Sequence, residues 1–487
     1  MAAIPDKRSL ILCFLVLLLA ADTVRGADTP SATDERSNTA VKEDSYGDQL
    51  DEAKDAKEKV SNRRYDSEQP IDLKFGGKII SSYRYYKDID NQKALPDFLR
   101  WSYSNDLYYW MLLRKNKTHT VYTVLTDSYV TRGVGETYTG IGADNAGVSL
   151  SMGYYQLNLS QEYGVPLRIT FGRQYLFLGT GIAYAALNDG LQVEYFKEPF
   201  YVKYFSAVTR PRQDNIDYSV PGYDKNGDRV FHGLEAAYTG IPNTSLYAFG
   251  LIQKDFSSEN PDLAGQGFRY NSRYLGAGLS STFFDSLQVW SEAILEKGST
   301  FTDSTRTPLQ NESTIEASSV AGGLRYRPEW RFHPLFESSY AFASGDGNRT
   351  SPTNTLGGDT DGLDKNFLYF GYYQTGYALS PRLSNIQIAE IGSSFKPLES
   401  YAFFKKMTLG TRYYFYWKDE AEGGISDLEA TGNDLNIGEE WNTYLNWQIF
   451  ADISLILKYG IFFPGEAFSA DTRENTQYFS SALSITF

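Results

Sequence analysis

The last ten residues of the chain, Tyr478 to Phe487, alternate between the two faces of an extended strand. Phe479, Leu483, Ile485 and Phe487 share one face, and mostly small or polar side chains occupy the other. A closed sheet in lipid requires such strands of about ten residues, because every backbone group must pair within the sheet. An amphipathic strand at the end of a soluble sandwich alternates in the same way. The segment alone leaves both architectures open.

The N-terminus favours the membrane architecture. Lys7 and Arg8 precede an apolar run from Leu10 to Ala21, and small residues begin at Gly26, which is the pattern of a secretory signal peptide. No later stretch approaches the roughly 18 to 20 uninterrupted apolar residues that a transmembrane helix needs. We therefore predict a cleaved signal peptide over residues 1–26 and expect any membrane crossing to be made by strands.

The composition is typical of a transmembrane barrel. Aromatic residues make up 15% of the chain, and 42 glycines accompany only 17 prolines. Aromatic side chains gird the two interfaces of such barrels, and glycine relieves crowded, curved strands. The formal net charge of -14 disfavours nucleic-acid binding.

Residues that catalysis needs are scarce. The chain has three histidines and a single cysteine, Cys13, which lies inside the predicted signal peptide. The sequence has no Gly-x-Ser-x-Gly elbow and no His-Glu-x-x-His motif. We predict no enzymatic activity; a lipase-like Ser-His pair on the outer face is the alternative.

Residues 27–70 are rich in charge and poor in apolar side chains, with only Tyr46 and Tyr65 as aromatics. Such a segment cannot bury enough apolar surface to offset the entropy of ordering it. We predict a largely disordered, acidic periplasmic extension over 27–70 and an outer-membrane barrel over 71–487.

The barrel region contains eighteen alternating segments separated by turn signals. The predicted strands are 71–86, 97–114, 118–131, 148–160, 166–179, 190–198, 200–210, 229–240, 245–256, 270–282, 285–299, 317–330, 333–346, 383–397, 405–419, 438–450, 452–464 and 476–487. An even number places both termini in the periplasm, as in bacterial outer-membrane barrels. The stretch near 367–379 also alternates and is a candidate nineteenth strand.

Connection lengths alternate between short and long. Glu198-Pro199, Phe284-Asp285 and 450–452 predict tight periplasmic turns, whereas 211–228, 300–316, 347–382 and 420–437 predict long polar surface loops. The fold class predicted from these patterns is all-β: a single antiparallel transmembrane barrel of about eighteen strands.

Several motifs resemble the alginate-export outer-membrane porins of Gram-negative bacteria. Gly172-Arg173-Gln174 resembles a strand signature of that family, and Ser344-Gly345-Asp346 begins a stretch that follows the family's order. After the first motif the family often has Gly-Asp and an arginine, whereas Leu178 to Ile182 here carry no charge. The resemblance implies an eighteen-stranded barrel, passive passage of an anionic polysaccharide through a cationic lumen, and periplasmic export components as partners.

Strand phase gives candidate residues for the lumen. Cations that attract carboxylates without holding them are what a polyuronate conduit needs, and the arginine fork suits carboxylates. The residues predicted to face inward are Arg84, Arg100, Arg168, Arg325, Arg327, Arg412, Lys458 and Lys203, with Tyr414 and Tyr444 as sugar-stacking platforms. Arg173 has lipid-side parity and requires a bulge after Gly172 or a position near the interface.

Structural alternatives stay open for these residues. A luminal cation can pair with Glu194, Glu235, Glu337 or Asp106 and simply fill the interior. A tyrosine near a strand end can belong to an interfacial girdle.

The aspartates Asp359, Asp361 and Asp364, interleaved with glycines, are candidates for a calcium loop, with a solvated turn as the alternative. We expect no other cofactor.

The function predicted from these observations is an outer-membrane channel for passive export or diffusion of an anionic polysaccharide, such as an alginate-like polyuronate, or a related anionic solute. The alternatives are a general or small-substrate porin on the same barrel, and a structural or adhesion barrel whose surface loops bind a partner. The expected partners are membrane lipid, the anionic solute and periplasmic export components.

Overall fold

The protein is described here from a computed structural model. The structure describes residues 71–87, 99–134, 141–145, 147–160, 162–211, 213, 215–216, 227–257, 267, 269–302, 311–353 and 358–487. The predicted signal peptide, 1–26, and the predicted extension, 27–70, lie outside these residues.

Eighteen strands in the described part of the chain form one antiparallel wall. They are β1 (Ile71–Lys87), β2 (Leu99–Lys115), β3 (His119–Val134), β5 (Ser149–Asn158), β6 (Leu167–Phe177), β7 (Ala185–Lys197), β8 (Phe200–Val208), β9 (Arg229–Ile241), β10 (Thr244–Asp255), β11 (Asn271–Phe283), β12 (Leu287–Phe301), β13 (Glu312–Tyr326), β14 (Leu335–Ala343), β16 (Ile386–Phe395), β17 (Met407–Lys418), β18 (Asn436–Gln448), β19 (Ile453–Pro464) and β20 (Thr476–Thr486). Each overlaps one of the predicted segments, so the prediction of an eighteen-stranded barrel is confirmed.

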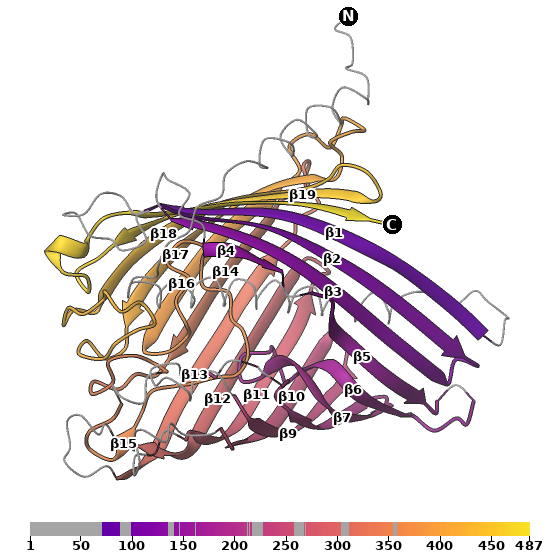
Figure 1. Ribbon diagram of the computed structural model, residues 1–487, viewed down its shortest axis with the longest axis horizontal. Coiled ribbons are helices and arrows are strands. Elements are labelled where there is room, and N and C mark those ends of the chain that lie inside the picture. The colour runs from indigo at the N-terminus through magenta and orange to yellow at the C-terminus, as the bar shows by residue number, and fades with distance from the viewer. Residues whose placement is uncertain are drawn as a thin grey trace, which may run out of the picture.

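The wall closes on itself. Each strand pairs antiparallel with the next in the chain, and β1 pairs with β20, from Lys78 opposite Thr486 to Lys87 opposite Gln477. Figure 1 shows the indigo β1 lying against the yellow C-terminal strands. Closure leaves no edge strand, which is the condition for a sheet in hydrocarbon.

Two short strands are accessories to this wall. β4 (Ile141–Asn145) pairs with the end of β3, and β15 (Leu363–Asp364) runs parallel beside β13. The candidate nineteenth strand, 367–379, is not part of the wall; its only isolated bridge joins Phe370 to Tyr184. That alternation reflects a segment buried on both sides rather than a membrane strand.

The outer face carries the apolar half of the alternation. On β1, for example, Leu73, Phe75 and Ile79 are exposed on one face, whereas Tyr86 is buried on the other. Among the described residues no helix is long and apolar enough to cross a bilayer.

The short turns are as tight as expected. At the β11–β12 turn, Phe284 and Asp285 both have positive φ, 53° and 57°, the backbone that a two-residue hairpin turn requires. The long connection between β14 and β16 behaves differently, because much of it packs inside the barrel.

Candidate functional site

The tip of the β6–β7 hairpin leaves the wall and enters the lumen. β5 pairs with β6 only as far as Arg173, and β8 pairs with β7 only from Asp189 onward. Beyond these points the two strands pair only with each other. Gln174, Tyr175 and Leu176 are consecutive and all buried, at 4%, 2% and 0% exposure. A wall strand would expose every second side chain, so both faces of this tip are covered by protein.

The Gly172-Arg173-Gln174 motif lies where the tip bends inward. Gly172 has a φ of +117°, and a Cβ there would lie 2.4 Å from the carbonyl oxygen of Gly153. Only glycine fits this backbone. Arg173 donates two hydrogen bonds to Asp189 on β7, at 2.7 and 2.9 Å, and a third to the carbonyl of Leu150. Arg173 thus stays on the outward parity and is neutralised by its neighbour rather than lining the lumen.

The described residues of the β14–β16 connection, 344–353 and 358–385, form the second segment that enters the barrel, which we call the 344–385 segment. The Ser344-Gly345-Asp346 motif anchors its start. The Ser344 hydroxyl donates to the Lys365 carbonyl, and the Gly345 amide donates to Asp419. A Cβ on Gly345 would lie 1.8 Å from the side-chain oxygen of Asn385, so the motif needs glycine at this position.

The two inserted segments meet inside the lumen. The Phe370 amide donates to the Ala183 carbonyl and the Tyr372 amide to the Gly181 carbonyl, both at 3.0 Å. A Cβ on Gly371 would lie 1.8 Å from the oxygen of Gly181. The contact is backbone against backbone, and it joins residues that are almost 200 positions apart in the sequence.

Carboxylates of the inner wall hold these segments through their amides. Glu235 on β9 accepts from the Gly179 amide at 2.8 Å, and Glu292 on β12 accepts from the amide and hydroxyl of Thr180, both at 2.7 Å. All of these groups are within or beside the buried core of the lumen.

The later segment is held in the same way. Glu296 on β12 accepts from the Leu368 amide at 3.0 Å. Glu440 on β18 accepts from three successive amides, including those of Ala378 at 2.9 Å and Leu379 at 2.8 Å. A buried carboxylate is costly unless it is hydrogen-bonded, and these inserted backbones supply the donors.

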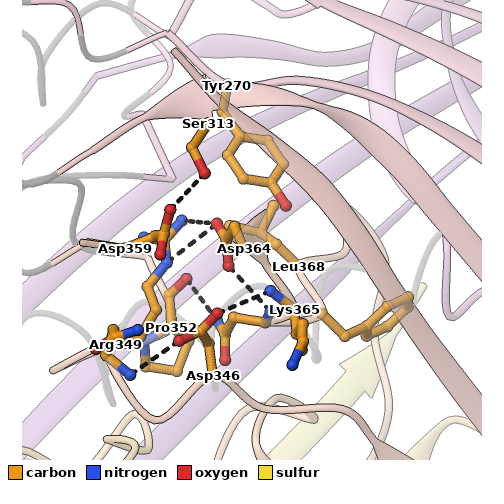
Figure 2. Close-up of polar contacts among 12 residues, drawn as sticks. Tyr270, Ser313, Asp346, Arg349, Pro352, Asp359, Asp364, Lys365 and Leu368 are labelled. Carbon is orange, nitrogen blue, oxygen red and sulfur yellow. Dashed lines mark hydrogen bonds and ion pairs between the residues drawn. The ribbon is translucent and has the colours of Figure 1, made fainter. Parts of the chain in front are cut away.

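A buried ion pair organises the outer part of the 344–385 segment (Figure 2). Arg349, 2% exposed, pairs with Asp364, which is fully buried. Asp359 accepts from the Ser313 hydroxyl on β13 and from the amides of Asp361 and Gly362. Burial alone would raise the pKa of Asp359, but these hydrogen bonds outweigh burial and hold that pKa below its usual value.

The same contacts bear on the candidate calcium loop. Asp364 is committed to Arg349, Asp359 to the turn that it caps, and exposed Asp361 accepts from the Leu363 amide. Its hydrogen bond with Asp359 raises the pKa of Asp361. Within the described residues no group of three His, Cys, Asp or Glu side chains could hold a metal ion. The geometry fits a hydrogen-bonded turn, which was the alternative.

Two predicted lumen cations belong to a charge ladder across four strands. Arg168, Glu194, Lys203 and Glu235 lie opposite one another in register from β6 to β9. Arg168 approaches Glu194 at 3.4 Å, and Lys203, 2% exposed, approaches Glu235 at 3.2 Å. Lys203 is buried over the Phe177 ring of the inserted tip. It pairs with a wall carboxylate, as the structural alternative anticipated.

Arg325 and Arg412 converge on one carboxylate. Arg412 on β17 lies 2.7 Å from Glu337 on β14 and 3.2 Å from Glu390 on β16, and Arg325 on β13 approaches Glu337 at 3.7 Å. Gly392 sits between the strands of Glu337 and Arg412, and a Cβ there would lie 2.9 Å from Glu337 Cγ and 3.1 Å from Arg412 Cγ. Because Gly392 has no side chain, the Arg412 and Glu337 side chains can meet across it.

Three sequence predictions need correction or refinement. β13 ends at Tyr326, so Arg327 lies in the connection after the strand, where its amide donates to the Ser286 carbonyl, and strand phase does not place it in the lumen. Tyr414 is 1% exposed and stacked on Tyr416 at 5.9 Å, so its ring is core and cannot meet a sugar. Tyr444 is half-buried, with Arg412 5.5 Å above its ring.

The remaining predicted cations lie on a different part of the wall. Arg84 on β1, Arg100 on β2 and Lys458 on β19 all have inward parity, since Arg84 and Lys458 both lie opposite Ser480 of β20. Lys458 sits 5.3 Å from the ring centre of Tyr377, which belongs to the inserted 344–385 segment. Tyr377 also packs with Tyr86 and Tyr478.

The inner wall therefore divides into two parts. We call β6–β14 and β16–β18 the covered wall, because its carboxylates accept hydrogen bonds from the inserted segments. We call β19, β20, β1, β2, β3 and β5 the basic wall, which the inserted segments contact through apolar and aromatic side chains. In described strands of the covered wall, six cations face eight carboxylates: Arg168, Lys203, Arg229, Arg325, Arg412 and Lys418 against Glu194, Glu235, Asp255, Glu292, Glu296, Glu337, Glu390 and Glu440.

The basic wall has the opposite balance. Its described strands direct seven cations and two carboxylates inward: Lys74, Lys78, Arg84, Arg100, Arg114, Arg132 and Lys458 against Asp72 and Asp106. Sequence reasoning missed Lys74, Lys78, Arg114 and Arg132 and the role of the carboxylates. Strand parity could have found the cations; only the loop amides identify what the carboxylates do.

Comparison with known proteins agrees with this architecture. The family model described as alginate export matches residues 206–481, more than half of the 487 residues. Two crystal structures, of Pseudomonas aeruginosa OccK5 (OpdH) and OccK8 (OprE), are similar to this chain with TM-scores of 0.52. Their identities are 11% and 10%, and each comparison covers 85% of this chain and 98% of the other. At this identity the similarity shows the fold alone. No curated protein sequence matches the chain.

Proposed function

The chain belongs to the alginate-export family of Gram-negative outer-membrane proteins, and we propose that this outer-membrane channel carries an anionic polysaccharide, such as a polyuronate, out of the periplasm by passive diffusion. Periplasmic export components that deliver the polymer are part of the same proposal. The observation that carries it is the basic wall, where seven inward cations face only two carboxylates.

The two parts of the inner wall suit different tasks. On the covered wall, four carboxylates accept hydrogen bonds from the inserted segments, and Lys203 and Arg412 are paired at close range. A paired charge has a weak field beyond its partner. The basic wall carries a surplus of positive charge instead, and the field of that surplus would attract a passing anion.

A polyuronate carries one carboxylate per sugar, so it can exchange contacts from one cation to the next without being trapped. Arginine contributes a fork that matches a carboxylate and stays charged at any relevant pH. Tyr444 is half-buried beside Arg412 and offers a ring face to sugars as they pass. The chain's own residues thus attract and guide the polymer, and the gradient supplies the direction.

Planar-bilayer recording tests this proposal. The reversal potential in a salt gradient should show anion selectivity, and a polyuronate added to the periplasmic side should reduce the single-channel current. A neutral glucan of equal length is the control and should leave the current unchanged.

Three results would contradict the proposal in distinguishable ways. A channel that passes small anions but ignores the polyuronate would be a small-substrate porin. Equal permeability to anions and cations would indicate a general porin, and absence of any conductance would indicate a structural or adhesion barrel.

A further inference from the structure

Three neighbouring periplasmic turns are joined into one surface that the transport proposal does not use. They are 327–334 after β13, 396–406 after β16 and 449–452 after β18, and together we call them the turn platform. The Lys396 amide donates to the Phe332 carbonyl, which joins the first turn to the second. The Lys406 ammonium donates to Gln448 at 3.1 Å, which joins the second to the end of β18.

Aromatic rings pack against one another over this platform. Phe403 lies edge-on to Trp447 at 5.0 Å and to Phe450 at 6.0 Å, and Phe404 stacks on Trp447 at 5.1 Å. The Trp447 indole donates to the Phe403 carbonyl at 3.3 Å. Phe403 is nevertheless 48% exposed and Tyr401 is 64% exposed. A packed, partly exposed aromatic group of this kind is fixed in position and still open to an apolar partner.

The aromatic group continues the lipid-facing surface of the barrel. Trp447 lies opposite Met407, and two positions along the same strands Leu445 lies opposite Leu409, so these four side chains share the outward face. The Phe403 ring packs on Trp447 just beyond the strand ends. A lipid acyl chain that contacts Leu445 on the outward face therefore also reaches the aromatic rings of the platform, just beyond the strand ends.

The charge of the platform is opposite to that of the chain. Its three turns hold five basic residues, Arg327, Arg331, Lys396, Lys405 and Lys406, against three acidic ones, Glu329, Glu399 and Asp452. Glu399 is engaged by His333 at 3.3 Å and by the Phe332 amide. The surplus is +2 in a chain whose formal net charge is -14. Lys405 and Lys406 are both exposed beside the aromatic group.

We propose that the turn platform binds an anionic glycerophospholipid of the periplasmic leaflet of the outer membrane. The phosphate meets Lys396, Lys405 and Lys406, and the upper part of an acyl chain packs on Trp447 and Phe403. When cations lie beside an interfacial aromatic group, the cations can bind an anionic headgroup while the aromatic rings contact the acyl chain of the same lipid.

Continuity with the lipid-facing strands favours lipid over a soluble protein partner. The apolar part of the platform begins at Trp447, a residue of the outward strand face, and hydrocarbon covers that face in the membrane. A soluble partner would have to displace lipid in order to reach it.

Quenching of Trp447 fluorescence by brominated lipid tests the proposal. The full chain is reconstituted in phosphatidylcholine vesicles that contain increasing fractions of brominated phosphatidylglycerol or brominated phosphatidylcholine. The Trp447 contribution is the difference between the wild type and W447F. Brominated phosphatidylglycerol should quench Trp447 at a lower mole fraction than brominated phosphatidylcholine. In K396Q/K405Q/K406Q this preference should fall by at least about tenfold, since each surface cation raises the affinity for an anionic lipid roughly fivefold.

The matched control is K254Q/R273Q/K297Q, which removes three exposed cations at the opposite ends of β10, β11 and β12 and should keep the preference. Equal quenching by the two lipids in the wild type would overturn the proposal and leave an ordinary aromatic belt. Retention of the preference in the platform variant, or equal loss in the control, would also overturn it. An absence of quenching by either lipid would place the platform in the periplasm, open to a soluble partner.

A salt titration of the wild type keeps the test decisive if the platform variant does not fold. The preference for phosphatidylglycerol should fall as the salt concentration rises from about 0.05 M to about 0.5 M, because salt screens surface charges. Quenching by brominated phosphatidylcholine should stay constant. A preference that does not respond to salt would contradict binding through lysine.

Discussion

The covered wall and the basic wall belong to the same closed sheet and follow the same alternation, yet their inward charges do different things. On the covered wall the carboxylates accept hydrogen bonds from backbone amides of the inserted segments, as Glu440 does from three successive residues. On the basic wall Lys458 contacts the inserted segment through the ring of Tyr377. The difference indicates that acidic residues of the covered wall position the inserted segments through hydrogen bonds, whereas the basic wall contributes a surplus of positive charge to the lumen.

The largest expected effect comes from removing the carboxylate that holds residues 377–379. Glu440→Ala leaves three amides without their acceptor inside a buried site, which we expect to cost about 3 kcal/mol. Thermal unfolding of the detergent-solubilised protein measures the loss, and single-channel conductance should rise as the segment moves away from the wall.

The outer-surface variant Glu316→Ala is the control for this measurement. It removes an exposed partner of Lys297 and should change stability by less than about 1 kcal/mol. If Glu440→Ala had an equally small effect on both stability and conductance, the carboxylates of the covered wall would not be what positions the inserted segments.

The packing around Glu337 provides the next test. Gly392→Ala places a Cβ 2.9 Å from Glu337 Cγ and 3.1 Å from Arg412 Cγ, so the ion pair must separate, at a cost of about 1–2 kcal/mol. Thermal unfolding is again the measurement.

Gly250→Ala is the matched glycine variant, because its Cβ would meet only the Tyr274 carbonyl oxygen, at 3.9 Å. We expect no measurable destabilisation from it. Equal midpoints for the two variants would mean that the Arg412 pair adapts without strain.

Selectivity provides the most direct comparison of the two walls. Arg84→Gln combined with Lys458→Gln should lower the anion-to-cation permeability ratio by at least about threefold, because cations on a low-dielectric wall concentrate anions near them. Reversal potentials in a planar bilayer give the ratio.

The matched pair on the covered wall is Arg168→Gln with Glu194→Gln, which removes an ion pair as a unit and leaves the net charge unchanged. We expect its permeability ratio to stay within about a factor of two of the wild type, since a neutral pair has a short-range field. Larger loss from this pair than from the basic-wall pair would reverse the assignment of roles.

The smallest expected effect concerns the turn at the outer end of the inserted 344–385 segment. The hydrogen bond with Asp359 raises the pKa of Asp361, so the contribution of Asp361 to stability is greatest at low pH and is lost as the pH rises through that raised pKa. Asp361→Asn provides a permanent donor and should remove this decline. The change should stay within about 0.5 kcal/mol, because Asp361 is exposed and screened. Thermal midpoints measured from about pH 4, near the usual carboxyl pKa, to about pH 8 check this prediction. A steeper decline of stability with pH in the variant would contradict the assignment.

Strand positions and their faces were predictable from the sequence. All eighteen predicted segments overlap wall strands, because a period of two is a local property and a single buried face forces the register. Parity alone also placed Arg84, Arg100, Arg168, Arg325, Arg412, Lys203 and Lys458 on the inward face. It misplaced Arg327 only because the strand boundary was four residues too long.

The burial and contacts of each inward residue were not predictable from strand parity. Tyr414 and Tyr444 share one phase, yet the first is buried in the core and the second is half-buried beside Arg412. The stretch 367–379 alternates like a wall strand, and it instead packs in the lumen with its backbone against Gly181 and Ala183.

Local alternation, turn chemistry and the motifs around Gly172 and Ser344 were sufficient to predict a closed outer-membrane barrel of this family. The folding of residues 174–188 and 344–385 into the lumen depended on contacts such as those of Thr180 with Glu292, 112 positions away, and of Leu379 with Glu440, 61 positions away. Pairing at such separations is set by the closure of the whole sheet, which decides the carboxylates that an inserted amide can reach, and no local pattern of residues encodes that distance.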